Sequence, residues 1–166
     1  MLMNEILSPS RILAKVRVNS KKRLLELLAK EVSKELPEAD ANNIFDAFLS
    51  RERLGSTAMG EGIAIPHCRV KQCKRILGFF VQLESSIDFD AMDGKPVDLI
   101  FAVVVPVEAN DEHLQVLSEV AKIFSQANIR TRLRNNDDTE QLLHILTDEH
   151  DSPEIAGKPL SNASMN

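Results

Sequence analysis

The chain has 166 residues, with 20 Lys and Arg against 25 Asp and Glu, a formal net charge of −5, and 43% hydrophobic residues. This length predicts one domain that buries about 70% of the surface of its unfolded chain, a core that needs neither disulfides nor metal. The acidic balance counts against nucleic acid as the main partner, because phosphate backbones recruit basic faces. No run of about 18 apolar residues occurs, so we expect no membrane insertion.

The start of the chain and its cysteines indicate a compartment. The first residues, MLMNEILSPSR, lack the basic segment followed by an apolar run that marks a secretory signal. Cys68 and Cys73 lie five positions apart, which is not the pattern of a disulfide framework. We therefore expect a cytoplasmic protein.

The first third of the chain predicts one strand and two helices. Residues 11–18 alternate apolar and polar side chains, the period of a half-buried strand. A helix follows from Ser20, which can cap its first turn, and Pro37 stops it. A second helix is expected from about Asp40 to near Gly55, the residue type best suited to a left-handed cap.

The middle of the chain predicts strands. Residues 76–83 and 97–105 are short and rich in Val, Ile and Phe. Because residues 97–105 are apolar at nearly every position, we expect a strand that is covered on both faces. Residues 62–66 can supply another short extended segment.

The last third is helical and sets the fold class. One helix opens at Asn110 or Asp111 and reaches Phe124, and after a short stretch at 129–133 a final helix starts at Asp138 or Thr139. Residues 151–166 are polar and rich in Pro, Gly, Ser and Asn, so we expect a flexible tail. Strands and helices do not strictly alternate, which predicts an α/β fold: a three-layer α/β/α sandwich with a mixed β-sheet flanked by helices.

The segment RERLGSTAMGEGIAIPHC, residues 51–68, presents a histidine on a stiff backbone. The apolar run Ile63-Ala64-Ile65 is followed by Pro66, which biases Ile65 toward extended geometry. We therefore expect His67 to leave the end of an apolar strand with its ring directed from a rigid base. A neutral imidazole is nucleophilic, and its ordinary pKa of about 6.5 leaves much of it unprotonated near neutrality.

This segment resembles the active-site signature of type 2 enzyme IIA domains of the bacterial phosphoenolpyruvate-dependent phosphotransferase system. The resemblance lies in Glu52, Met59-Gly60 and the run Ile63-Ala64-Ile65-Pro66-His67-Cys68. The wider RERLGSTAMGEGIAIPH string and DFDAMDGKPVDLIFAVVVP downstream most resemble the nitrogen-regulatory members. The resemblance covers residues 5–150, which we take as the domain. Most relatives carry glycine where this chain has Cys68, and a larger side chain there can narrow the approach of a partner.

The resemblance implies roles for three residues. His67 is expected to accept a phosphoryl group on Nε2 from phosphohistidine on a small HPr-like phosphocarrier protein. Arg51 corresponds to the family's pocket arginine, and its guanidinium can grip two phosphoryl oxygens. His113, in the HLxxL pattern, corresponds to a histidine that helps hold the group. Ser56 and Thr57 offer nearby hydroxyl donors. Apart from the resemblance, Arg51 is also explained as a solvated cation at a helix end and His113 as a helix-start residue.

Other chemistries fail on spacing. His67, Cys68 and Cys73 lack the second ligand pair of a metal site, so we expect no metal. No Gly-x4-Gly-Lys-Ser/Thr loop occurs, so we expect no nucleotide cofactor and a phosphoprotein as donor. A basic rim beside the site is either a solvated face or a contact for an acidic partner; it comprises Arg69, Lys71, Lys74 and Arg75.

Three functions remain open at this point. The leading hypothesis is a regulatory enzyme IIA of the nitrogen/potassium type, whose phosphorylated and free forms bind target proteins differently. The alternative is a sugar-specific enzyme IIA of the fructose/mannitol type that passes the phosphoryl group to a IIB transporter component. The third is a binding module that keeps the fold and has lost the chemistry. The family also makes a homodimer plausible.

Overall fold

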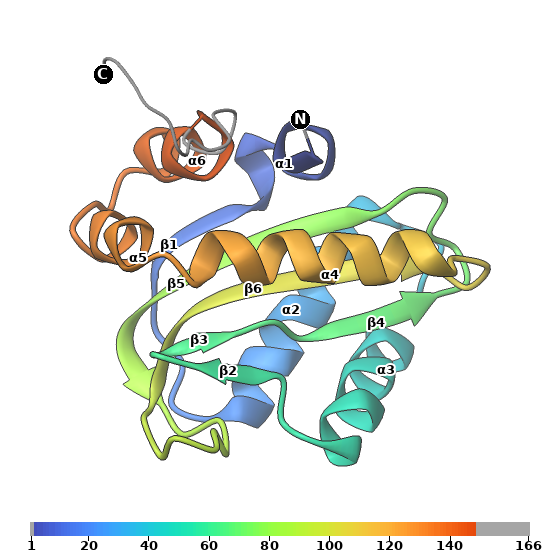
Figure 1. Ribbon diagram of the computed structural model, residues 1–166. Helices are drawn as coiled ribbons and strands as arrows, with labels where there is room; N and C mark the ends of the chain where they lie inside the picture. The colour runs from blue at the N-terminus through green and yellow to red at the C-terminus, as the bar shows by residue number, and fades with distance from the viewer. Residues whose placement is uncertain (1, 149–166) are drawn as a thin grey trace.

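A computed structural model describes residues 2–148, which form a mixed sheet between two layers of helices (Figure 1). The strands are β1 (Ile12–Val16), β2 (Ala58–Gly60), β3 (Ile63–Ala64), β4 (His67–Val70), β5 (Leu77–Ile87) and β6 (Val97–Pro106). The helices are α1 (Leu2–Ile6), α2 (Lys21–Glu35), α3 (Ala41–Leu54), α4 (Asp111–Phe124), α5 (Ala127–Arg134) and α6 (Thr139–Asp148), with a short 3-10 turn at Pro9–Arg11. The predicted three-layer sandwich is confirmed.

The sheet has the order β1-β5-β6-β3-β2, with β4 also paired to β6. Strand β5 is antiparallel to β6, whereas β3 and β4 both run parallel to it, so the sheet is mixed. The two short strands share one side of β6, with Ile63 opposite Leu99 and His67 opposite Val103. Between them the carbonyl of Pro66 accepts a hydrogen bond from the Val103 amide at 2.9 Å, so the proline stays attached to the sheet.

Strand β6 is covered on both faces, as its apolar run predicts. Ile100, Ala102 and Val104 belong to a core that includes the buried residues of α2 and α3. The alternate residues of β6 face a second core, built with α1, α4, α5 and α6; they are Leu99, Phe101, Val103 and Val105. Figure 1 shows α4 lying along one face of the sheet and α2 on the other. The layers follow from the period of two along a strand.

The predicted helix starts are confirmed, and one predicted cap is wrong. The Ser20 hydroxyl accepts a hydrogen bond from the Arg23 amide at 3.1 Å, and the Asp40 carboxylate accepts one from the Asn42 amide at 3.0 Å. Helix α3 does end before Gly55, but this glycine has φ +157° and ψ 146°, so the end is not left-handed. The chain leaves α3 extended because it turns directly into the loop that leads to β2.

Four short elements were not predicted as such. Residues 127–134 form the complete helix α5 rather than a short stretch, and α1, β2 and β4 were missed. Each has eight residues or fewer, too few for a period to stand out. None of the helices within residues 2–148 combines the length and apolar character needed to cross a membrane. The predicted domain end at 150 and the tail at 151–166 lie outside the described residues.

Candidate functional site

His67 is the first residue of β4, and both of its ring nitrogens have partners. Nδ1 lies 2.9 Å from the carbonyl oxygen of Ile65, and Nε2 lies 3.2 Å from Nε of Arg51. A guanidinium can only donate, so Nε2 accepts and carries no proton. The carbonyl can only accept, so Nδ1 carries the proton and donates it to Ile65. The two contacts agree on one neutral tautomer with its lone pair on Nε2.

The surroundings of His67 favour this neutral form. Burial lowers the pKa of His67 and is the largest effect; the Ile65 carbonyl opposes it, the positive charge of Arg51 adds to the lowering, and the charge of Glu52 opposes it. The net direction is down from the ordinary value of 6.5. The ring is therefore mainly neutral at neutral pH, the form in which an imidazole nitrogen can act as a nucleophile.

Arg51 lies in the last turn of α3, where its side chain spans from the helix end to the histidine. Its Nη1 donates to the Gly55 carbonyl at 2.9 Å, while Nε donates to His67. The helix end thus holds the guanidinium in place beside the ring. A planar guanidinium fixed in this way can bind two oxygens of a phosphoryl group.

Glu52, one residue further along α3, is a buried carboxylate that anchors the loop after the helix. It is 6% exposed and forms an ion pair with Lys21 at 3.0 Å. It also accepts hydrogen bonds from the amide of Thr57, at 3.1 Å, and from the Thr57 hydroxyl. The sequence signature contained Glu52 but gave it no role, and the structure shows that it holds the segment between Arg51 and His67.

The hydroxyls of Ser56 and Thr57 are both engaged within the protein. The Ser56 hydroxyl donates to the Phe89 carbonyl at 2.6 Å and accepts from the Ala58 amide at 3.1 Å. The Thr57 hydroxyl donates to Glu52. The two residues therefore stabilise the loop, and neither hydroxyl hydrogen is directed at the His67 ring in this arrangement.

His113 approaches His67 from the other side of the site, in the first turn of α4. The two ring centroids are 5.8 Å apart and the ring planes are inclined by 50°. Nδ1 of His113 lies 3.3 Å from Nη2 of Arg69, so Nδ1 accepts and the neutral ring carries its proton on Nε2. Burial lowers the pKa of His113, the positive charge of Arg69 lowers it further, and so does the electrostatic interaction with His67, since two neighbouring rings do not both gain a proton readily.

Arg69 is the residue at this site that sequence reasoning missed. The sequence places Arg69 in a basic rim of four residues. Among these four, Arg69 is the one for which the structure gives a hydrogen bond to His113. The signal was available, because residues two apart on a strand point to the same side, so Arg69 shares the side of β4 that bears His67. Its Nη1 donates to the carbonyls of Val107, at 2.8 Å, and Ala109, at 2.5 Å.

Cys68 points away from this group. It lies between His67 and Arg69 on β4, is 7% exposed, and belongs to the core formed with α2 and α3. Burial strongly raises the pKa of the Cys68 thiol. The expectation that this larger side chain narrows a partner's approach is wrong, because strand alternation sends it into the core.

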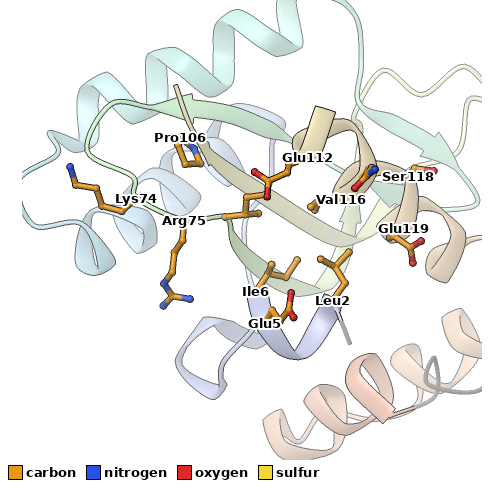
Figure 2. Close-up of a pocket in the computed structure, with 12 residues that line it drawn as sticks. Leu2, Glu5, Ile6, Lys74, Arg75, Pro106, Glu112, Val116, Ser118 and Glu119 are labelled. Atoms are coloured by element: carbon orange, nitrogen blue, oxygen red, sulfur yellow. The ribbon is translucent and has the colours of Figure 1, made fainter. Parts of the chain in front are cut away.

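A separate cavity of about 910 Å³ lies between α1, α4 and the turn before β5. Figure 2 shows Lys74 and Arg75 on its rim, together with Glu5, Glu112 and Glu119. Lys74 and Arg75 line this cavity, whereas Arg69 contacts His113. The residues predicted as one basic rim therefore belong to two different places. His67, Arg51 and His113 are not among its lining residues. Within residues 2–148, no group of three or more His, Cys, Asp or Glu side chains is arranged to hold a metal ion.

The site thus consists of a neutral histidine on a sheet edge, a second histidine and two arginines. A family model described as "Phosphoenolpyruvate-dependent sugar phosphotransferase system, EIIA 2" matches residues 5–149. The chain belongs to this family, as its signature indicated.

Within this family, the chain is similar to several nitrogen regulatory proteins. The chain is 46% identical over 146 residues to a nitrogen regulatory protein of Pseudomonas aeruginosa, covering 88% of this chain and 95% of that protein. It is 43% identical over 144 residues to the nitrogen regulatory protein of Escherichia coli, covering 86% and 88%. The crystal structure of nitrogen regulatory protein IIA-Ntr from Neisseria meningitidis superposes with a TM-score of 0.84 at 42% identity, covering 89% of this chain and all of that one. The chain is an EIIA-type component of the phosphotransferase system.

Proposed function

We propose that this protein accepts a phosphoryl group on Nε2 of His67 and transmits its phosphorylation state to regulatory targets. The carrying observation is the pair of contacts that leaves Nε2 unprotonated: Arg51 donates to it, and Nδ1 donates its proton to Ile65. A phosphoryl acceptor needs an available lone pair on a ring held in a fixed direction. His67 meets both requirements.

The proposed step exchanges one nitrogen–phosphorus bond for another. Arg51 first releases Nε2, whose lone pair then forms the new bond to phosphorus. The bond to the donor histidine breaks, and that imidazole leaves with the electron pair. The proton on Nδ1 stays in place, and the Ile65 carbonyl stabilises the positive charge that the His67 ring gains.

Two side chains are placed to meet the phosphoryl oxygens in this proposal. The guanidinium of Arg51 is free to bind them once it leaves the ring nitrogen. His113, whose ring lies 5.8 Å from that of His67, carries a proton on Nε2 that can donate to these oxygens. Phosphoryl transfer depends mainly on positioning and on stabilising oxygen charge, which is what this arrangement supplies.

The proposed donor is a phosphohistidine on an HPr-like carrier, and exposed apolar side chains near the site support a protein visitor. Leu54 is three residues after Arg51 on α3. Val107 lies in the loop before α4, and Leu114 follows His113 on α4. All three side chains are exposed. Large apolar groups around a polar centre are typical of a protein docking surface.

The relatives' names favour a regulatory output over sugar transport. A phosphoryl group adds about −1.5 to −2 charges, enough to change such a surface.

The experiment supplies phosphoenolpyruvate, enzyme I and the phosphocarrier, and then maps labelled phosphate on the wild type and on His67→Ala. We expect an acid-labile, alkali-stable label on the wild type and none on the variant. His144→Ala, which removes a histidine of α6, is the matched control and keeps the label. An unlabelled wild type, with a carrier shown to be phosphorylated, would defeat the phosphotransfer proposal and leave a binding module.

A second arm separates regulation from transport. The labelled protein is incubated with a fructose- or mannitol-type IIB protein. We expect the label to remain. Efficient transfer to IIB would replace the regulatory role with the sugar-specific one. The homodimer and the cytoplasmic location remain predictions.

A further inference from the structure

One guanidinium joins the nucleophile's strand to the helix that carries the second histidine. Arg69 lies two residues after His67 on β4, and it donates to the carbonyls of Val107 and Ala109 as well as to Nδ1 of His113. These three acceptors come from the loop after β6 and from the first turn of α4. Arg69 thus connects the strand that holds one histidine to the segment that holds the other.

We propose that Arg69 is a positioning residue that fixes His113 with its Nε2–H toward the phosphoryl group on His67. The inference rests on the proposed phosphotransfer function and adds a residue to it. Arg69 acts through His113 and does not itself hold the phosphoryl oxygens.

Arg69 adds contacts to a helix start that has no side-chain cap. Asn110 stands at the cap position, but its side chain makes no capping hydrogen bond to the helix. The amides of a first helical turn lack partners within the helix, so an uncapped start is free to shift. The bonds of Arg69 to the carbonyls of Val107 and Ala109 hold the backbone just before this turn.

The same guanidinium selects the tautomer of His113. With Nδ1 accepting from Arg69, the neutral ring must place its proton on Nε2. The opposite tautomer would turn a lone pair toward the phosphoryl oxygens and repel them. The two histidines therefore complement each other: His67 provides a lone pair on Nε2 and His113 provides a proton on Nε2.

Arginine suits this task better than lysine. A guanidinium offers five donors in a rigid plane and can serve the loop carbonyls and the ring together. A lysine would bring the same charge on a flexible stem without this fixed geometry. Charge and geometry can therefore be separated by Arg69→Lys, and both are removed by Arg69→Met, which keeps an apolar stem.

The first test observes the tautomer directly. Two-dimensional proton–nitrogen spectra of protein labelled at histidine nitrogens, recorded without any phosphoryl donor, distinguish Nδ1–H from Nε2–H rings. We expect His113 as the Nε2–H tautomer in the wild type and a mixture in Arg69→Met. Lys71→Met is the matched control, since it removes a cation from the same strand-end region and should leave the His113 signals unchanged. A wild-type Nδ1–H ring would overturn the inference whatever the outcome of phosphorylation.

The second test is a double-mutant cycle on the rate of phosphoryl transfer to His67. We expect Arg69→Met to slow transfer on the order of ten- to a hundredfold, because a small misplacement of a holding group costs this much. In a His113→Ala background the same change should have little further effect. An equal slowing in both backgrounds would show that Arg69 acts without His113, and full rescue by Arg69→Lys would show that charge alone suffices; either result overturns the positioning role. If no wild-type transfer occurs, the proposed function fails, while the tautomer spectra still decide how Arg69 and His113 are joined.

Discussion

Nε2 of His67 accepts a hydrogen bond from Nε of Arg51 at 3.2 Å, so the atom proposed as the nucleophile is occupied in the free protein. This contact has two effects. It keeps a proton off Nε2, since a guanidinium beside the nitrogen disfavours a second positive charge. It also holds the guanidinium of Arg51 close to the position that the oxygens of an incoming phosphoryl group would occupy. Arg51 must exchange one partner for the other during transfer.

The exchange of partners makes Arg51 sensitive to substitution. We expect Arg51→Ala to fold normally and to slow phosphoryl transfer about a hundredfold, in the range found when one charge-stabilising donor is removed. Arg51→Lys should recover only part of the rate, because a single ammonium cannot bind two oxygens as a guanidinium does. Rates of label incorporation and the lifetime of the phosphoprotein measure both.

The control for this prediction is Arg53→Ala, which removes an exposed arginine from the same turn of α3. It should leave the rate unchanged. If Arg51→Ala transfers as fast as the wild type, and its phosphoprotein lasts as long, Arg51 has no part in the site.

The long helices and strands of this fold could be predicted because each one spans several repeats of its apolar pattern. Helices α2, α3 and α4 and strand β6 all follow apolar repeats that the structure buries. The short strand β4 could not be read in this way. It holds four residues, and its polar positions, His67 and Arg69, are the ones that form the site.

The site was predicted unevenly for a related reason. The sequence motif identified His67 as a candidate, and the family resemblance added Arg51 and His113. The structure places these three residues, from β4, α3 and α4, next to one another. Arg69 directly follows the signature segment, and its side of the strand could be inferred from its spacing to His67, but its partners could not: they are the distant carbonyls of Val107 and Ala109 and the ring of His113. Contacts between side chains and distant backbone leave no trace in residue spacing.

The neutral state of His67 sets the pH dependence of phosphorylation. Because burial lowers the pKa of His67 from 6.5, we expect the acceptance rate to fall on acidification with a midpoint below pH 6.5, as the ring gains a proton. Proton spectra followed over pH should place the midpoint of His67 below 6.5. A midpoint above 6.5 would contradict the prediction.

The same shift links pH to stability. With the pKa of the folded protein below that of the unfolded chain, the unfolded chain binds more protons in the window between them. Stability from His67 and His113 is therefore present above pH 6.5 and is lost as pH falls through the lowered values. Denaturant unfolding of the wild type and of His67→Ala, compared at several pH values, measures the part due to His67: the wild type should lose more stability on acidification.

Glu52 is predicted to contribute mainly to stability. Its buried carboxylate pairs with Lys21 and holds Thr57, so Glu52→Gln should lower the free energy of unfolding by about 3 to 5 kcal/mol, as when one partner of a buried ion pair is removed. The charge of Glu52 also raises the pKa of His67, so this pKa should fall further in the variant. Glu84→Gln, which breaks the exposed pair with Arg17, is the control and should change stability little. Equal losses in the two variants would contradict the special role of the buried carboxylate.

Cys68 provides a test that separates the core from the site. Its side chain packs into the core on the side of β4 opposite His67, so Cys68→Gly should leave the transfer rate within about twofold of the wild type. The same change should lower the free energy of unfolding by about 1 to 2 kcal/mol, because it empties a buried position and puts glycine in a strand. Cys68→Ala distinguishes these two causes, since it keeps the backbone restricted while it removes the sulfur. Faster transfer in Cys68→Gly, with no comparable gain in Cys68→Ala, would mean that the side chain does restrict the visiting protein, and the assignment of Cys68 to the core alone would be wrong.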